Sequence, residues 1–108
     1  MTRRTSHRCD ANQTAIVEAL RKAGCSVAIT SSSGDGFPDI VAGKNGVNWL
    51  IEIKDGNKPP SQQRLTDGQA RFHDDWEGQI CVINSVDDAL ELISLKKMDY
   101  YKDKINNK

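Results

Sequence analysis

Two acidic residues and a lysine occur close together in the middle of the sequence. Asp39 follows Pro38, and twelve further residues separate it from Glu52, Ile53 and Lys54. Carboxylate oxygens are ligands that Mg²⁺ prefers, usually together with waters and a substrate phosphate. A lysine beside them can hold a nucleophilic water or stabilise negative charge on a phosphate. The residue types therefore indicate metal-assisted hydrolysis of a phosphodiester, provided that the fold brings the side chains together.

A β-hairpin would bring them together. Asn45 and Gly46 are the strongest short signal for a hairpin, because a type I′ turn requires positive φ at both central positions. With these residues in the turn, paired positions sum to 91, and Asp39 falls opposite Glu52. Side chains alternate along a strand, so Lys54 shares their face. The other face is uniformly apolar and is predicted to be core: Ile40, Ala42, Trp49, Ile51 and Ile53.

Like charges that face each other across two strands are destabilising, and a divalent cation between Asp39 and Glu52 would remove the repulsion. We expect this site at the end of the hairpin remote from the turn, beside the loop at 31–36 (SSSGDG). The backbone N–H groups and small residues of that loop, Ser33 among them, are expected to admit a polynucleotide backbone. Alternatively, Glu52 and Lys54 form the solvent face of an edge strand, and Asp39 is a turn residue.

The remaining elements have to position this hairpin. Apolar residues recur at i, i+4 and i+7 over 11–23 and predict a helix, which Asp10 or Asn12 can cap and Gly24 ends. The rest of the pattern predicts, in order, strands at 25–30, 39–42 and 47–54, a loop at 58–65, a helix from Thr66 or Asp67 to about Trp76, a strand at 79–84, and a helix at 85–95 with Ser85 and Asp88 spaced as a capping box. The order α-β-β-β-α-β-α predicts a mixed α/β fold with a central antiparallel meander.

The segments 36–43 (GFPDIVAG) and 49–56 (WLIEIKDG) resemble the motif core of the PD-(D/E)XK nuclease superfamily. They are similar above all to small phage-encoded nucleases of the VRR-NUC and Holliday-junction-resolvase-like group. The likeness covers roughly residues 8–95. It implies a restriction-endonuclease-like αβββαβ core with a mixed central sheet flanked by helices. We expect a single nuclease domain over 1–108, with its core at about 10–95 and flexible or peripheral tails at 1–9 and 96–108.

By this resemblance, Asp39 and Glu52 bind Mg²⁺ or Mn²⁺, the Ile53 carbonyl is a further ligand, and Lys54 is the catalytic lysine. The superfamily tends to place an acidic residue on the first helix near the metal. The sequence departs from that pattern, because Gln13 occupies the inward position and Glu18 lies on the opposite face.

Further residues after the hairpin have two interpretations each. Gln69 resembles a glutamine that supports the active site in several branches of the superfamily, or it is a surface residue at the start of a helix. Lys58 and Arg64 either grip phosphate or are solvated loop charges.

The composition indicates the cellular compartment of the protein more clearly than it indicates the substrate. Fifteen Lys and Arg balance fifteen Asp and Glu, so net charge does not indicate a nucleic-acid binder. The three cysteines lack CxxC spacing, which argues against zinc; Cys25 and Cys81 are predicted to be core residues. No apolar run approaches the ~18 residues of a membrane span, and no signal peptide is evident. We therefore expect a protein of the cytoplasm, and the resemblance implies a phage-encoded or bacterial origin.

These observations predict a metal-dependent DNA endonuclease, with branched or structured DNA as a possible substrate. One alternative is a module with the nuclease fold that binds DNA or has a regulatory role, and that has weak or no catalytic activity. Another is a structural or interaction protein in which the charged tail at 96–108 recruits a partner. A chain of 108 residues offers little surface for two DNA strands, so a homodimer is expected.

Overall fold

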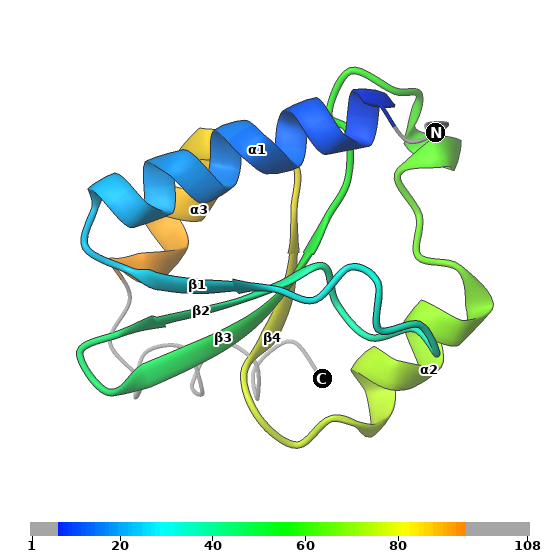
Figure 1. Cartoon of the computed structure of the whole chain (residues 1–108). Coiled ribbons are helices and arrows are strands. Elements are labelled where there is room, and N and C mark those ends of the chain that lie inside the picture. The colour runs from blue at the N-terminus through cyan, green and yellow to red at the C-terminus, as the bar shows by residue number, and fades with distance from the viewer. Residues whose placement is uncertain (1–6, 95–108) are drawn as a thin grey trace.

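The computed structural model describes the backbone of residues 7–94 and the side chains of residues 11–94. Figure 1 shows a sheet with helices packed beside it. The elements are α1 (His7–Lys22), β1 (Ser26–Ile29), β2 (Ile40–Lys44), β3 (Val47–Ile53), the 3₁₀ turn η1 (Pro60–Gln62), α2 (Asp67–Asp75), β4 (Ile80–Ile83) and α3 (Val86–Ile93). The predicted mixed α/β class and the order of its helices and strands are confirmed. Residues 7–9 belong to α1, and the other tail residues, 1–6 and 96–108, lie outside the described part.

The strands form one sheet in the order β1-β2-β3-β4. β1, β2 and β3 are a meander of antiparallel neighbours, whereas β4 runs parallel to β3. Asn45 and Gly46 have φ values of 55° and 81°, as a type I′ turn requires. The pairs Ile40 with Ile51 and Lys44 with Val47 confirm the predicted register. The strand order places β3 between β2 and β4 in the interior of the sheet, so the edge-strand interpretation of Glu52 and Lys54 is wrong.

One face of the sheet is covered by α1 and α3, which also contact each other (Figure 1). The apolar face predicted for the hairpin is buried there, together with Ile16 and Leu20 of α1. Burial of each such side chain stabilises the fold by about 1.5–3 kcal/mol. Cys25 is buried, and Cys81 packs against this core; both are free thiols.

The start of α1 differs from the prediction. The helix begins at His7, so Asp10 and Asn12 lie within it and neither caps it. Asn12 instead donates its side-chain amide to the carbonyl of Lys54, at 2.8 Å, and this tertiary partner replaces a local capping bond. The end of the helix is as predicted, because Gly24 has φ 99° and follows the last helical turn.

The predicted loop at 58–65 contains η1, whereas the two later helices begin as expected. Thr66 caps α2. Ser85 caps α3 by accepting a bond from the backbone N–H of Asp88. The predicted capping box of α3 is only half formed, because the carboxylate of Asp88 accepts from Asn84 rather than from Ser85.

α2 lies apart from the other two helices, against the loop that joins β1 to β2 (Figure 1). Gly36 of that loop sits so close to α2 that an added Cβ would lie 2.5 Å from the carbonyl oxygen of Gly68. Phe37 packs edge-on against Phe72 of α2, with ring centroids 5.2 Å apart. The loop and α2 therefore form one unit beside the sheet.

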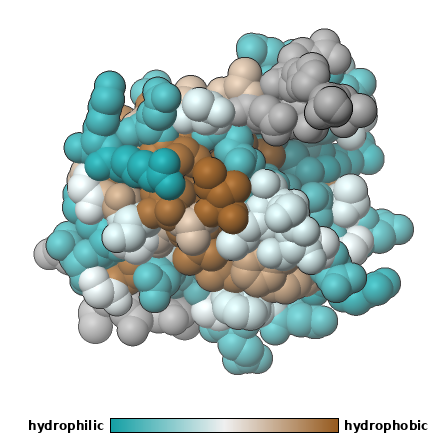
Figure 2. All heavy atoms as spheres, in the orientation of Figure 1, coloured by the Kyte–Doolittle hydropathy of each residue, from teal (hydrophilic) through white to brown (hydrophobic). Residues whose placement is uncertain are grey.

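Figure 2 shows apolar side chains gathered near the centre of the face seen in Figure 1, with hydrophilic side chains around them. The edge strand β1 crosses this face in Figure 1, and its Ile29 is 56% exposed. Within residues 7–94, no helix has the length and apolar character that crossing a membrane would require.

Candidate active site

Residues from separate elements meet at the end of β3 that is remote from the hairpin turn. They line a cleft of about 560 Å³. Asp39, Glu52 and Lys54 all line it, together with Ser31 and Ser32 of the neighbouring loop. The structure thus brings the predicted acidic pair and lysine together, at the predicted end of the hairpin.

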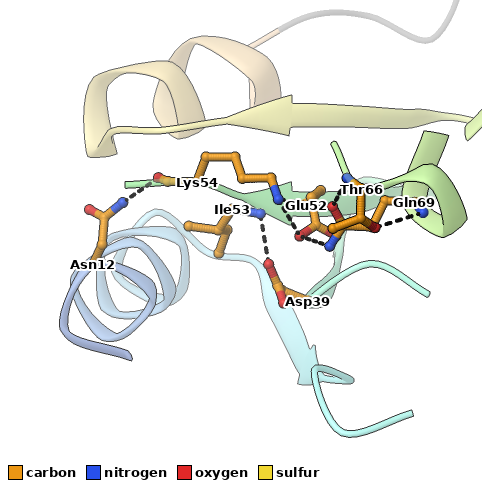
Figure 3. A network of polar contacts seen from close by, with 7 residues as sticks. All are labelled: Asn12, Asp39, Glu52, Ile53, Lys54, Thr66 and Gln69. Atoms are coloured by element: carbon orange, nitrogen blue, oxygen red, sulfur yellow. Dashed lines mark hydrogen bonds and ion pairs between the residues drawn. The ribbon is translucent and has the colours of Figure 1, made fainter. Parts of the chain in front are cut away.

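Asp39 stands immediately before β2 and is fixed from two directions. Its backbone N–H donates to the carbonyl of Ile51 at 3.0 Å, and its own carbonyl accepts from Thr30 at 2.8 Å. Its carboxylate Oδ2 accepts the backbone N–H of Ile53 at 2.8 Å (Figure 3). The regular pairing of the two strands ends at Ile40, and the Asp39 side chain continues the connection to β3.

Glu52 is buried, with 3% of its surface exposed. Its Oε2 accepts a hydrogen bond from Gln69 Nε2 at 3.0 Å and lies 3.7 Å from Lys54 Nζ. Its Oε1 is buried and has no hydrogen-bond partner among the described residues. Burial, reinforced by the negative charge of Asp39, raises the pKa of Glu52 to about 8, although Lys54 acts in the opposite direction.

Lys54 directs its ammonium group into the same network (Figure 3). Nζ donates to Gln69 Oε1 at 2.9 Å, and the side chain is 14% exposed. The backbone of Lys54 is held on both sides, because its N–H donates to Ile83 and its carbonyl accepts from Asn12. The contact with Asn12 was not predicted, since nothing local in the sequence connects residues 42 positions apart.

Gln69 lies inside the site, so the interpretation of a mere surface residue is wrong. It is the third residue of α2 and forms a reciprocal capping box with Thr66. Its Oε1 accepts both the Thr66 N–H and the Lys54 ammonium, at 2.9 Å each, while its Nε2 donates to Glu52. The start of α2 is thereby tied to both charged groups.

The other predicted site residues divide into two groups. Gln13 and Lys58 line the cleft, as expected. Arg64 and Ser33 are exposed and are not among its lining residues. Ser31 and Ser32 line the cleft in place of Ser33, and the loop turns directly after Ser33 at Gly34 and Asp35, which both have positive φ.

The donor set fits a hard divalent cation. The partnerless Glu52 oxygen is buried in a cleft beside a second carboxylate, and Ile53 also lines that cleft. Oxygen ligands of this kind suit Mg²⁺, which takes one or two carboxylates and completes its coordination with waters and substrate. The described residues contain no group of three or more His, Cys, Asp or Glu that could hold a metal.

Comparisons with known proteins bear on the family and the fold of this chain. Residues 5–99 match the family described as archaeal Holliday junction resolvase (Hjc). A solved structure described as a VRR_NUC domain is 26% identical and superposes with a TM-score of 0.62, covering 81% of this chain and 95% of that one. No curated protein matches. The structural match confirms the expected restriction-endonuclease-like fold. Since the family match spans most of the sequence, the chain belongs to the archaeal Holliday junction resolvase family, within the PD-(D/E)XK nuclease superfamily.

Proposed function

We propose that this protein is a metal-dependent endonuclease that hydrolyses phosphodiester bonds in branched DNA. Family membership supports a DNA nuclease. The observation that carries the finer proposal is the buried Glu52, whose free Oε1 shares a cleft with Asp39 and Lys54. Two carboxylates this close repel each other once both are ionised, and a bound cation would remove that repulsion.

Asp39 and Glu52 would hold Mg²⁺ or Mn²⁺, with the carbonyl of Ile53 as a third protein ligand. A divalent cation supplies Lewis acidity, which makes water more nucleophilic and neutralises charge on the phosphate. The hydrogen bond from the Ile53 N–H fixes the Asp39 carboxylate in advance. Gln13 of α1 adds the uncharged oxygen of its side-chain amide to the cleft, at a position where relatives tend to place an acidic residue.

Lys54 would stabilise the negative charge that develops on the phosphate during attack by water. Gln69 and Glu52 hold its ammonium group, so little reorganisation is needed when substrate arrives. Lys58 lines the same cleft and would bind a neighbouring phosphate. Because the chain has no net charge, attraction of DNA would depend on such local cations.

A binding module with little catalysis is the second candidate. The presence of Gln13 in the cleft, in place of an acid, favours it, because one negative charge fewer weakens the hold on a second cation. Under this alternative the protein would bind DNA through the same surface without cutting it.

Cleavage of a four-way junction, a fork and a linear duplex, with Mg²⁺, Mn²⁺ or EDTA, separates the two functions. We expect cleavage of the branched substrates in either metal and none in EDTA. Asp39→Ala and Lys54→Ala should each lower the rate at least 100-fold, whereas Glu18→Ala, on the exposed side of α1, should cut normally. Binding without cleavage in both metals would favour the module, and full activity of Lys54→Ala would refute the assigned roles.

We also propose that the protein acts as a homodimer, in the cytoplasm of a bacterial cell. The strand β1 is an edge of the sheet and carries the exposed Ile29, which supports a contact between copies on this side. Light scattering would show about twice the 12.0 kDa mass of one chain. A monomer both with and without DNA would refute the dimer and leave the nuclease proposal standing.

A further inference from the structure

A second cleft, of about 500 Å³, lies beside the proposed active site and shares two segments with it. It is lined by the loop residues Asp35 and Gly36 and by Arg71, Phe72 and Trp76 of α2 and its C-cap. The same loop supplies Ser31 and Ser32 to the catalytic cleft, and the same helix supplies Gln69. None of the roles assigned above uses this second cleft.

Aromatic rings form one side of this second cleft. Phe72 stacks on Trp76 with ring centroids 5.4 Å apart and an interplanar angle of 14°. Phe37 supports Phe72 from its edge. Trp76, at the end of this group of rings, is 39% exposed. Phe72 covers one face of the Trp76 ring and Gly78 lies close to its Nε1 edge, which leaves the opposite face of the ring for a stacked base.

The charges around the rings discriminate between possible ligands. Arg71 contributes one positive charge, whereas Asp35 and Asp75 contribute two negative ones. A phosphate would be repelled by this balance, but a neutral heterocycle would not. Aspartate accepts hydrogen bonds from the amino groups of bases, and arginine donates to their ring nitrogens and carbonyl oxygens. Stacking combined with hydrogen bonds at the edge is how proteins hold a base taken out of the helix.

We propose that this second cleft binds one unpaired nucleobase of the DNA substrate, stacked on Trp76. The inference rests on the proposed function, because a base pair that opens at the branch point of the DNA would present an unpaired base next to the site of cleavage. The tight contact between Gly36 and Gly68 fixes the loop against α2, so a base held here would set the position of the strand at Asp39, three residues further along. The cleft would thus select substrates with a base out of the stack.

The test compares two DNA probes in EDTA, so that it does not depend on cleavage. One is a duplex with a single bulged 2-aminopurine, and the other carries an abasic residue at the same place. Wild-type protein should bind the base-containing probe about tenfold more tightly, as stacking on one aromatic side chain allows. The 2-aminopurine emission should change on binding.

Trp76→Ala should remove this preference, and Trp76→Phe should retain most of it. Leu90→Ala is the matched control, because Leu90 is equally exposed but lies on α3. Arg71→Ala leaves the stacked rings of Phe72 and Trp76 in place and should also reduce the preference. This variant replaces Trp76→Ala as the test if Trp76→Ala does not fold. Equal binding of the two probes by wild type, or a preference that survives both substitutions, overturns the proposal. Failure of the wild type to cleave any DNA would refute the proposed function separately.

Discussion

Gln69 Oε1 accepts a hydrogen bond from Lys54 Nζ at 2.9 Å, and this bond links the first turn of α2 to the proposed catalytic lysine. The same oxygen accepts the backbone N–H of Thr66, so one side chain both caps the helix and holds the ammonium group. The amide nitrogen of Gln69 holds Glu52 as well. The geometry of the site therefore depends on the capping box that Thr66 and Gln69 form at the start of α2.

Thr66→Ala should lower both stability and cleavage. Loss of the capping hydroxyl costs about 0.5–2 kcal/mol and removes the bond to the backbone N–H of Gln69, so the first turn of α2 can fray and carry the Gln69 side chain away from Lys54. Ser85→Ala is the matched control, because it removes an equivalent cap from α3, away from the cleft. Thermal unfolding should show similar losses for the two variants, and single-turnover cleavage should be slowed only in Thr66→Ala. Equal cleavage by both variants would show that the cap does not position Gln69.

The stability of the metal-free protein should fall as pH rises from about 5 to about 8. Glu52 has its pKa raised by burial and by Asp39 from 4.5 to about 8, so in this range the folded protein binds a proton that the unfolded chain releases. The free energy of unfolding then decreases with pH, by at most about 1.4 kcal/mol per unit for one proton. Above pH 8 the effect should level off.

Urea denaturation in EDTA between pH 5 and 9 measures this slope. Glu52→Gln should lack it, since an amide does not titrate, and the difference between the two proteins cancels the contributions of the other titratable groups. Added Mg²⁺ should stabilise wild type more at pH 8 than at pH 6, because a cation must displace the proton to bind. Parallel pH curves for wild type and Glu52→Gln would contradict this account of the buried carboxyl.

Much of the candidate site could be predicted because one turn fixes it. Asn45 and Gly46 set the pairing of β2 with β3, and alternation along the strands then assigns each residue to a face. Asp39, Glu52 and Lys54 follow from those two facts. The bond between Asn12 and Lys54 could not be predicted, because it depends on how α1 packs on the sheet. Gln69 was recognised through family resemblance, whereas its dual bonding depends on where α2 sits.

Substitution of Lys58 and of Arg64 tests which of these two cationic side chains binds a DNA phosphate. Both follow the catalytic strand, but only Lys58 lines the cleft, and Arg64 is exposed outside it. Lys58→Ala should weaken DNA binding and reduce the slope of log affinity against log salt by about 1, as expected for one lost phosphate contact. Arg64→Ala should leave both values near wild type. Fluorescence anisotropy at four salt concentrations decides this, and a larger effect of Arg64→Ala would reverse the assignment.

Gly36→Ala should damage the site from a position that carries no functional group. Gly36 has φ 79°, and an added Cβ would lie 2.5 Å from the carbonyl oxygen of Gly68, so the loop must move away from α2. Gly34 has nearly the same φ, 77°, but an added Cβ there would meet no atom within 4 Å. Gly34→Ala therefore reports the backbone strain alone.

We expect Gly36→Ala to be less stable than Gly34→Ala by about 1–3 kcal/mol. It should also cleave more slowly, because the displaced loop leads directly into Asp39. If urea denaturation gives the two variants equal stability, α2 moves away from the added methyl group without loss of folding free energy. The contact between the loop and α2 would then not hold the site in place.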